Sequence, residues 1–186
     1  AIMEATMSGP YERLSSRTES GLINIIIDTP KGSRNKFKYD ESAQCFRLSR
    51  VLPAGASFPF DFGSIPKTLA EDGDPLDVLL ISEAASFPGC LMAGKLIGTI
   101  FGDQTEKNET VRNDRLLAVP VTPANPAPFS ALAELPDAWL KEIEHFFVSY
   151  NQIEGRKYNP IGRGGPQEAD KALCAAEQRF TKQDNR

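Results

Sequence analysis

The chain of 186 residues carries a formal net charge of −4 at pH 7, with 40% hydrophobic and 25% charged residues. Its length suggests one domain with a sizeable buried core, and its composition is ordinary for a globular protein. The negative charge argues against a nucleic-acid or an anionic-membrane partner, because both require a basic surface.

The first twenty residues are polar and show no hydrophobic periodicity. We therefore expect a flexible N-terminal arm at residues 1–20 and a single domain over residues 21–186. Strand patterns dominate the first two-thirds of that domain, at residues 22–28, 36–40, 45–51, 77–82, 91–101 and 116–121. Many short strands with glycine and proline between them indicate a barrel or a sandwich.

Helical patterns come last. Residues 137–150 repeat their apolar side chains at helical spacing, with Asp137 as the expected N-cap. A second helix is expected to begin near Pro166. The glycine-rich segment 154–166 between them lacks a phosphate-loop pattern and does not follow a strand, so it reads as a connector. The predicted architecture is a β-barrel flanked by two C-terminal α-helices.

The cysteine and histidine content limits the kind of metal site. Cys45, Cys90 and Cys174 are far apart, and His145 is the only histidine. This pattern excludes a zinc site with nitrogen and sulfur ligands and does not indicate a disulfide framework. Any metal must be a hard cation held by oxygen. His145 lies within the amphipathic helical pattern and is interpreted as structural.

The hydropathy pattern bears on the cellular location of the protein. No apolar run approaches the 18 residues that a membrane-spanning helix requires, and no signal-peptide pattern is present. We therefore expect a cytoplasmic protein.

The acidic loop EDGDPLD places Asp72, Asp74 and Asp77 within six positions, directly before an apolar strand. A solvated turn is one interpretation, since Asp, Gly and Pro are favoured turn residues. A calcium-binding helix-loop-helix is excluded, because Asp77 stands where its required glycine belongs. A magnesium site is the third interpretation, since Mg²⁺ takes carboxylates, water and phosphate oxygens.

Basic residues on the predicted strands favour the magnesium interpretation. Lys36, Lys38, Arg50 and Arg115 interrupt otherwise apolar patterns or stand at strand ends. Each alone would normally lie on a solvated face. Together with the clustered aspartates they indicate a site for a polyphosphate anion.

The segment DGDPLD at residues 72–77 resembles the signature of soluble, Mg²⁺-dependent inorganic pyrophosphatases of the single-domain barrel type. The resemblance covers roughly residues 20 to 180 and includes the segments 30–36, 58–66, 114–120 and 145–157. It implies a fold that is mainly β with α: a five-stranded, OB-like closed β-barrel flanked by two C-terminal α-helices. It also implies a homo-oligomer, by family resemblance a hexamer.

The resemblance further implies hydrolysis of inorganic pyrophosphate to two phosphates by a metal-activated water. The implied cofactor is Mg²⁺, with Mn²⁺ or another divalent cation as an alternative. The implied catalytic residue is Asp74, which helps to deprotonate or orient the water. The implied metal ligands are Asp28, Asp72, Asp77, Asp103 and Asp114. The implied substrate-binding residues are Lys36, Arg50, Arg115, Tyr150 and Lys157.

The chain departs from the family pattern at several positions. An acid, two tyrosines and a lysine of that pattern are replaced by Lys38, Phe58, Phe62 and Asn151. Asn113 stands where a second metal-bridging aspartate belongs, and Asp114 lies one position away. Because neighbouring residues on a strand face opposite sides, the sequence leaves open which of the two faces the metal. The departures predict weaker metal binding.

The sequence is compatible with three functions. The first is pyrophosphate hydrolysis. The second is a divergent homologue that acts on another phosphoanhydride or is catalytically inactive, motivated by the departures. The third is an OB-type nucleic-acid-binding module, which a barrel permits but which the negative charge and the clustered aspartates disfavour.

Overall fold

The computed structural model describes residues 9–184 of the chain. In chain order the helices and strands are α1 (Pro10–Arg13), β1 (Ile23–Thr29), β2 (Asn35–Asp40), β3 (Cys45–Val51), β4 (Asp61–Ser64), β5 (Asp77–Leu80), β6 (Leu91–Glu106), β7 (Glu109–Arg112), β8 (Arg115–Pro120), η1 (Leu132–Glu134), α2 (Asp137–Ile153), β9 (Lys157–Gly164) and α3 (Pro166–Asp184). The predicted strands and both predicted C-terminal helices are confirmed, with shifts of a few residues at their ends.

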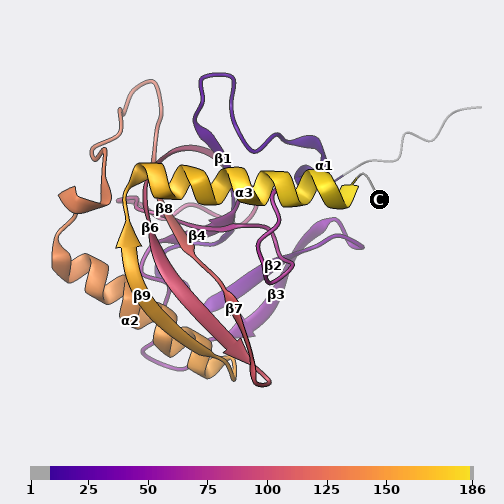
Figure 1. Cartoon of the computed structure of the whole chain (residues 1–186), viewed down its shortest axis with the longest axis vertical. Helices are drawn as coiled ribbons and strands as arrows, with labels where there is room; N and C mark the ends of the chain where they lie inside the picture. The colour runs from indigo at the N-terminus through magenta and orange to yellow at the C-terminus, as the bar shows by residue number, and fades with distance from the viewer. Residues whose placement is uncertain (1–8, 185–186) are drawn as a thin grey trace, which may run out of the picture.

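Five strands pair in a closed ring. The order is β1-β4-β5-β8-β6, and β6 pairs again with β1. All these pairs are antiparallel except β5 with β8, which is parallel. The five-stranded closure that the family resemblance implied is therefore present. The hairpin β2–β3 forms a separate two-stranded sheet beside the ring, as Figure 1 shows.

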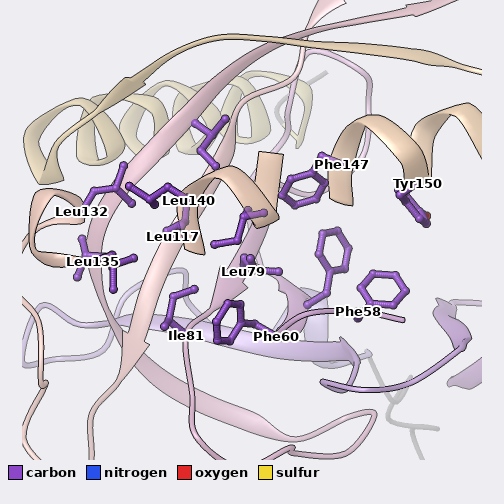
Figure 2. Packing of buried hydrophobic residues seen from close by; sticks show 14 of the residues in the cluster. Phe58, Phe60, Leu79, Ile81, Leu117, Leu132, Leu135, Leu140, Phe147 and Tyr150 are labelled. Atoms are coloured by element: carbon purple, nitrogen blue, oxygen red, sulfur yellow. The ribbon is translucent and has the colours of Figure 1, made fainter. Parts of the chain in front are cut away.

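Two hydrophobic clusters fill the molecule. One lies between the ring and α2 and is rich in aromatic rings; Phe147 and Tyr150 extend from α2 toward Phe58 in Figure 2. The other lies under α3 and includes Ala169 and Leu173 of that helix together with isoleucines of β1. Each helix thus covers one side of the ring with its apolar face, as its hydrophobic spacing predicted.

Two features of the helices differ from expectation. Asp137 is the first residue of α2 rather than its N-cap, a position that Pro136 takes. The Asp137 carboxylate instead pairs with Lys141 and Arg163. Trp139, predicted on the apolar face, is 39% exposed, and its ring centre lies 5.8 Å from that of the core residue Phe60.

The segment predicted as a connector contains a strand. β9 pairs antiparallel with the far half of β6, and β7 pairs with the last residues of β6. The long strand β6 therefore extends beyond the ring, and β7 and β9 pair with its two edges there. The glycines and Pro160 suggested a loop, but strands at a sheet edge tolerate proline because its missing N–H faces outward.

Part of the predicted N-terminal arm contacts the domain. Within residues 9–20, Ser16 Oγ donates a hydrogen bond to Glu177 Oε1 at 2.6 Å, and Arg17 pairs with Asp170 at 2.8 Å and with Glu177 at 3.1 Å. Figure 1 shows this segment, with α1, running beside α3. Residues 1–8 of the predicted arm lie outside the described residues.

None of the helices within residues 9–184 combines the length and the apolarity that crossing a membrane requires.

Candidate active site

A cavity of about 410 Å³ opens between the strand ring, the hairpin β2–β3 and the end of α2. Of the residues predicted to form the site, its lining contains Asp28, Lys36, Asp72, Asp74, Asp77, Arg115 and Tyr150. These residues come from β1, β2, the loop before β5, the start of β5, β8 and α2. The fold therefore brings together groups, such as Asp28 and Tyr150, that are separated by about two-thirds of the chain.

Asp77 and Arg115 are placed by strand pairing. They are the first residues of the parallel neighbours β5 and β8, whose register matches Val78 with Leu116. Their side chains consequently meet as an ion pair. The guanidinium of Arg115 also lies over the rings of Phe147 and Tyr158, at 5.1 and 5.6 Å.

Arg115 is buried, and this burial lowers the pKa of its guanidinium from the usual value. Its Nε has no hydrogen-bond partner. A buried guanidinium normally satisfies all its donors. The unpaired donor on the cavity wall therefore indicates a place for an anionic acceptor.

Asn113, and not Asp114, faces the cavity. The Asn113 side-chain amide donates to Asp72 Oδ2 and to Gln104 Oε1, both at 2.9 Å. Asp114 points to the opposite side and pairs with Arg112, which also lies 4.0 Å from Asp103. Neither Asp103 nor Asp114 lines the cavity. The alternation of side chains along extended backbone explains this outcome.

The acidic loop turns sharply at Gly73, whose φ of +88° favours glycine. The backbone N–H of Asp74 donates to Asp72 Oδ1 at 3.2 Å, which holds the loop in a tight turn. The Asp74 carboxylate lies 3.4 Å from the Nζ of Lys38, and both side chains are more than half exposed. Such an exposed pair contributes little to stability, so Asp74 is free to exchange partners.

Asp28 lies deeper in the cavity. Ser64 Oγ donates to its Oδ2 at 3.2 Å, and Tyr11 donates to its Oδ1 at 3.1 Å. Burial raises the pKa of Asp28 to about 7, while these hydrogen bonds and the charges of Lys36 and Lys38 act in the opposite direction. A nearby cation stabilises the charged form of such a poorly solvated carboxylate.

Lys36 and Arg50 face each other across the hairpin β2–β3. Both pair with Glu154 Oε1 at the end of α2, at 3.8 Å from Lys36 Nζ and 3.0 Å from Arg50 Nε. The Lys36 ammonium also lies 4.9 Å from the centre of the Tyr150 ring. Burial lowers the pKa of Lys36, and Glu154 counteracts that effect. Arg50 itself stands outside the cavity lining.

The structure does not bring Lys157 to the cavity: it is exposed on β9. Its neighbour Arg156 lines the cavity instead and pairs with Glu106 at 3.0 Å. Sequence reasoning also missed Tyr11 and Gln104. Alternation along β6 from Asp103 could have indicated Gln104, whereas no sequence pattern points to Tyr11.

Three of the departures from the family pattern, Phe58, Phe62 and Asn151, are buried in or beside the aromatic core. Phe62 packs against Phe58 and Phe147, at ring-centre distances of 5.6 and 6.3 Å. Asn151 donates to the backbone carbonyl of Phe147 at 2.8 Å, and its Oδ1 has no partner. Phe62 therefore offers only ring surface to the cavity that it lines.

The predicted acids at the cavity offer only carboxylate oxygens, from Asp28, Asp72, Asp74 and Asp77. Such oxygens suit a hard divalent cation. Among residues 9–184, however, no three acidic, histidine or cysteine groups stand together as a ready-made metal site. The donor chemistry therefore fits a cation that takes further oxygens from water or from a bound phosphate, as Mg²⁺ commonly does.

The fold is a closed ring of five strands, and carboxylates and cationic side chains line one cavity beside it. These features define a class of barrel protein whose cavity suits a small polyanion together with a cation bound by oxygen. A family model described as inorganic pyrophosphatase matches residues 25–181. The chain belongs to the inorganic pyrophosphatase family.

Relatives with the same description agree with this assignment. An inorganic pyrophosphatase from Synechocystis is 35% identical over 150 residues, which cover 81% of this chain and 86% of the relative. Another from Halalkalibacterium halodurans is 40% identical over 139 residues, covering 75% and 83%.

Solved structures are similar along nearly the whole chain. The inorganic pyrophosphatase from Thermus thermophilus has a TM-score of 0.81 at 27% identity, with coverage of 90% of this chain and 97% of that one. The enzyme from Neisseria gonorrhoeae has a TM-score of 0.80 at 29% identity, with coverage of 92% and 98%. The family resemblance found in the sequence is confirmed.

Proposed function

We propose that the protein is a hydrolase that cleaves inorganic pyrophosphate into two phosphate ions. The observation that carries this proposal is one cavity that gathers Asp72 and Asp77 with Lys36 and Arg115. Pyrophosphate is small and highly charged, so its hydrolysis depends on charge neutralisation and on the placement of water. The relatives named as inorganic pyrophosphatases support the same substrate.

Cationic side chains of the cavity bind the two phosphate groups in this proposal. Arg115 offers its unpaired Nε from the wall, and Lys36 and Arg156 offer further positive charge. The Tyr150 hydroxyl can donate to a phosphate oxygen, since burial raises its pKa and keeps the proton on. Arg50 and Lys157 would meet the substrate only at the rim.

Acidic side chains hold the cation and the water. Asp28, Asp72 and Asp77 are the proposed ligands of a divalent cation, with Mg²⁺ as the candidate. When bound, this cation neutralises phosphate charge and lowers the pKa of water. Asp74 is the proposed base: its exposed carboxylate on the acidic loop can accept a proton from the attacking water. Asp103 and Asp114, engaged by Arg112 outside the cavity, are left out of this set.

A phosphate-release assay with pyrophosphate tests the proposal. We expect wild-type activity with millimolar Mg²⁺ that a chelator abolishes, and a loss of about 100-fold or more in kcat for Asp74→Asn. Glu109→Gln is the matched control, because it removes an exposed carboxylate on β7 and should leave the rate unchanged. Failure of the wild-type protein to release phosphate would refute the assignment.

We also infer a cytoplasmic homo-oligomer, with a hexamer as the candidate from the family resemblance. Exposed apolar side chains support an interface, among them Phe87, Leu91 and Ile161, each about half exposed or more. Light scattering after size-exclusion chromatography measures the subunit number, and a monomer at micromolar concentration would contradict this inference.

A further inference from the structure

The N-terminal segment contributes a side chain to the cavity. Tyr11 of α1 lines it, and its hydroxyl lies 3.1 Å from Asp28 Oδ1 and 2.6 Å from Ser64 Oγ. Ser64 in turn reaches Asp28 Oδ2 at 3.2 Å, so each carboxylate oxygen has one hydroxyl beside it. Tyr11 precedes residue 25, where the match to the family begins. Tyr11 therefore lies outside the matched part of the chain, whereas its partners Asp28 and Ser64 lie inside it.

Two sets of contacts hold Tyr11 in this position. Its ring packs on Tyr39 of the hairpin, with ring centres 5.3 Å apart. A few residues later, Arg17 forms ion pairs with Asp170 and Glu177 on α3. Contacts of Tyr11 and Arg17 thus hold the segment against the domain at two points. They restrain the backbone that positions the Tyr11 hydroxyl.

We propose that Tyr11 is a positioning residue for the divalent-cation site, which it serves by holding the carboxylate of Asp28 toward the cavity. This inference deepens the proposed function and rests on it. Asp28 is partly buried in the cavity wall, where Tyr11 and Ser64 are hydrogen-bond donors to its two oxygens. With the Tyr11 hydroxyl removed, Oδ1 loses its donor, and the hydrogen bond from Ser64 to Oδ2 alone restrains the orientation of the carboxylate.

Partners that orient a metal ligand in this way commonly affect metal affinity by 10- to 100-fold when they are removed. We therefore expect Tyr11→Phe, which keeps the ring on Tyr39, to weaken Mg²⁺ binding about tenfold. Arg17→Gln should also weaken Mg²⁺ binding, by a smaller factor, because it loosens the segment without removing a group from the cavity lining. Glu12→Gln, an exposed neighbour on α1, is the matched control and should leave Mg²⁺ binding unchanged.

The experiment is calorimetric titration of the full chain with Mg²⁺ alone, without pyrophosphate. In parallel, phosphate release is followed against Mg²⁺ concentration. If Tyr11 positions Asp28, the Tyr11→Phe variant should need more Mg²⁺ to reach half of its maximal rate. At saturating Mg²⁺ it should have the wild-type kcat and the wild-type KM for pyrophosphate. A general structural defect would lower kcat at every Mg²⁺ concentration and would overturn the proposal.

Other outcomes are equally decisive. Equal or tighter Mg²⁺ binding by Tyr11→Phe, or no Mg²⁺ binding by the wild-type chain, would overturn the role of Tyr11. If calorimetry shows the tenfold difference while the wild-type protein releases no phosphate from pyrophosphate, the positioning role stands and the proposed substrate fails.

Discussion

Glu154 organises the cationic side of the cavity at the residue scale. It lies just after α2, where its carboxylate, 10% exposed, pairs with Lys36 and Arg50. The backbone carbonyl of Ile153 accepts a further hydrogen bond from Arg50 at 3.0 Å. The end of one helix therefore holds two cationic groups that would otherwise repel each other across the hairpin. In the proposed function, a phosphate in the cavity would compete with Glu154 for Lys36, which lines the cavity, more than for Arg50, which does not.

The variant Glu154→Gln tests this role. We expect the free energy of unfolding to fall by about 1–2 kcal/mol, because two partly buried cations lose their shared anion. Inorganic phosphate should restore part of the loss by taking the place of the carboxylate. Urea unfolding with and without phosphate measures both effects. Glu142→Gln, on the exposed face of α2, should change stability by less than about 0.5 kcal/mol; an equal loss there would count against the role of Glu154.

Local sequence predicted some residues of the cavity and missed others for a physical reason. Asp72, Asp74 and Asp77 were predicted because three carboxylates in one short loop need a cation. Tyr11 and Glu154 were not, since a tyrosine or a glutamate acquires this kind of role only from the residues that packing sets beside it.

At the element scale, β6 shows how a long strand extends the site. Its first half closes the ring with β1 and β8, and its second half pairs with β7 and β9. Gln104 and the connection to Asn113 lie on this extension. Close packing against β9 depends on Gly102, since a Cβ there would overlap the hydroxyl end of the Tyr158 ring.

Gly102→Ala should therefore destabilise the protein by about 1–3 kcal/mol, because Tyr158 is 3% exposed and has little room to move. Chemical denaturation measures the loss. Gly162→Ala on β9 is the matched control: its nearest neighbour would be Phe101 at 3.6 Å, an ordinary contact. Similar losses in both variants would show that glycine replacement in the sheet, rather than the overlap with Tyr158, causes the effect.

At the scale of the whole molecule, charged side chains of both signs meet in the cavity. The chain has a net charge of −4, yet Lys36, Lys38, Arg115 and Arg156 all line one cavity. Folding thus places these four cationic side chains beside five acids, the four aspartates and Glu41. An anion that enters with a divalent cation can satisfy both sets of charges.

This arrangement predicts that ligands stabilise the fold. Phosphate with Mg²⁺, at 100 times its dissociation constant, should raise the Tm by roughly 5–10 °C, since binding to the folded state alone adds about 2.7 kcal/mol. Scanning calorimetry measures the shift, and a chelator should reduce it. Lys36→Met should show a smaller shift at the same phosphate concentration. An equal rise with sodium chloride of the same ionic strength would indicate general screening instead.

The sequence by itself determined most of the strands, the two C-terminal helices and the family, and it predicted a polyanion site with oxygen ligands for a cation. These follow from local periodicity and from clustered charges, which a single chain segment already contains. Only the tertiary structure decided that Asn113 rather than Asp114 faces the cavity, that residues 157–164 form a strand, and that Tyr11 reaches Asp28. Each of these depends on pairing or packing between segments far apart in the chain, and such contacts leave no periodic signal in the sequence.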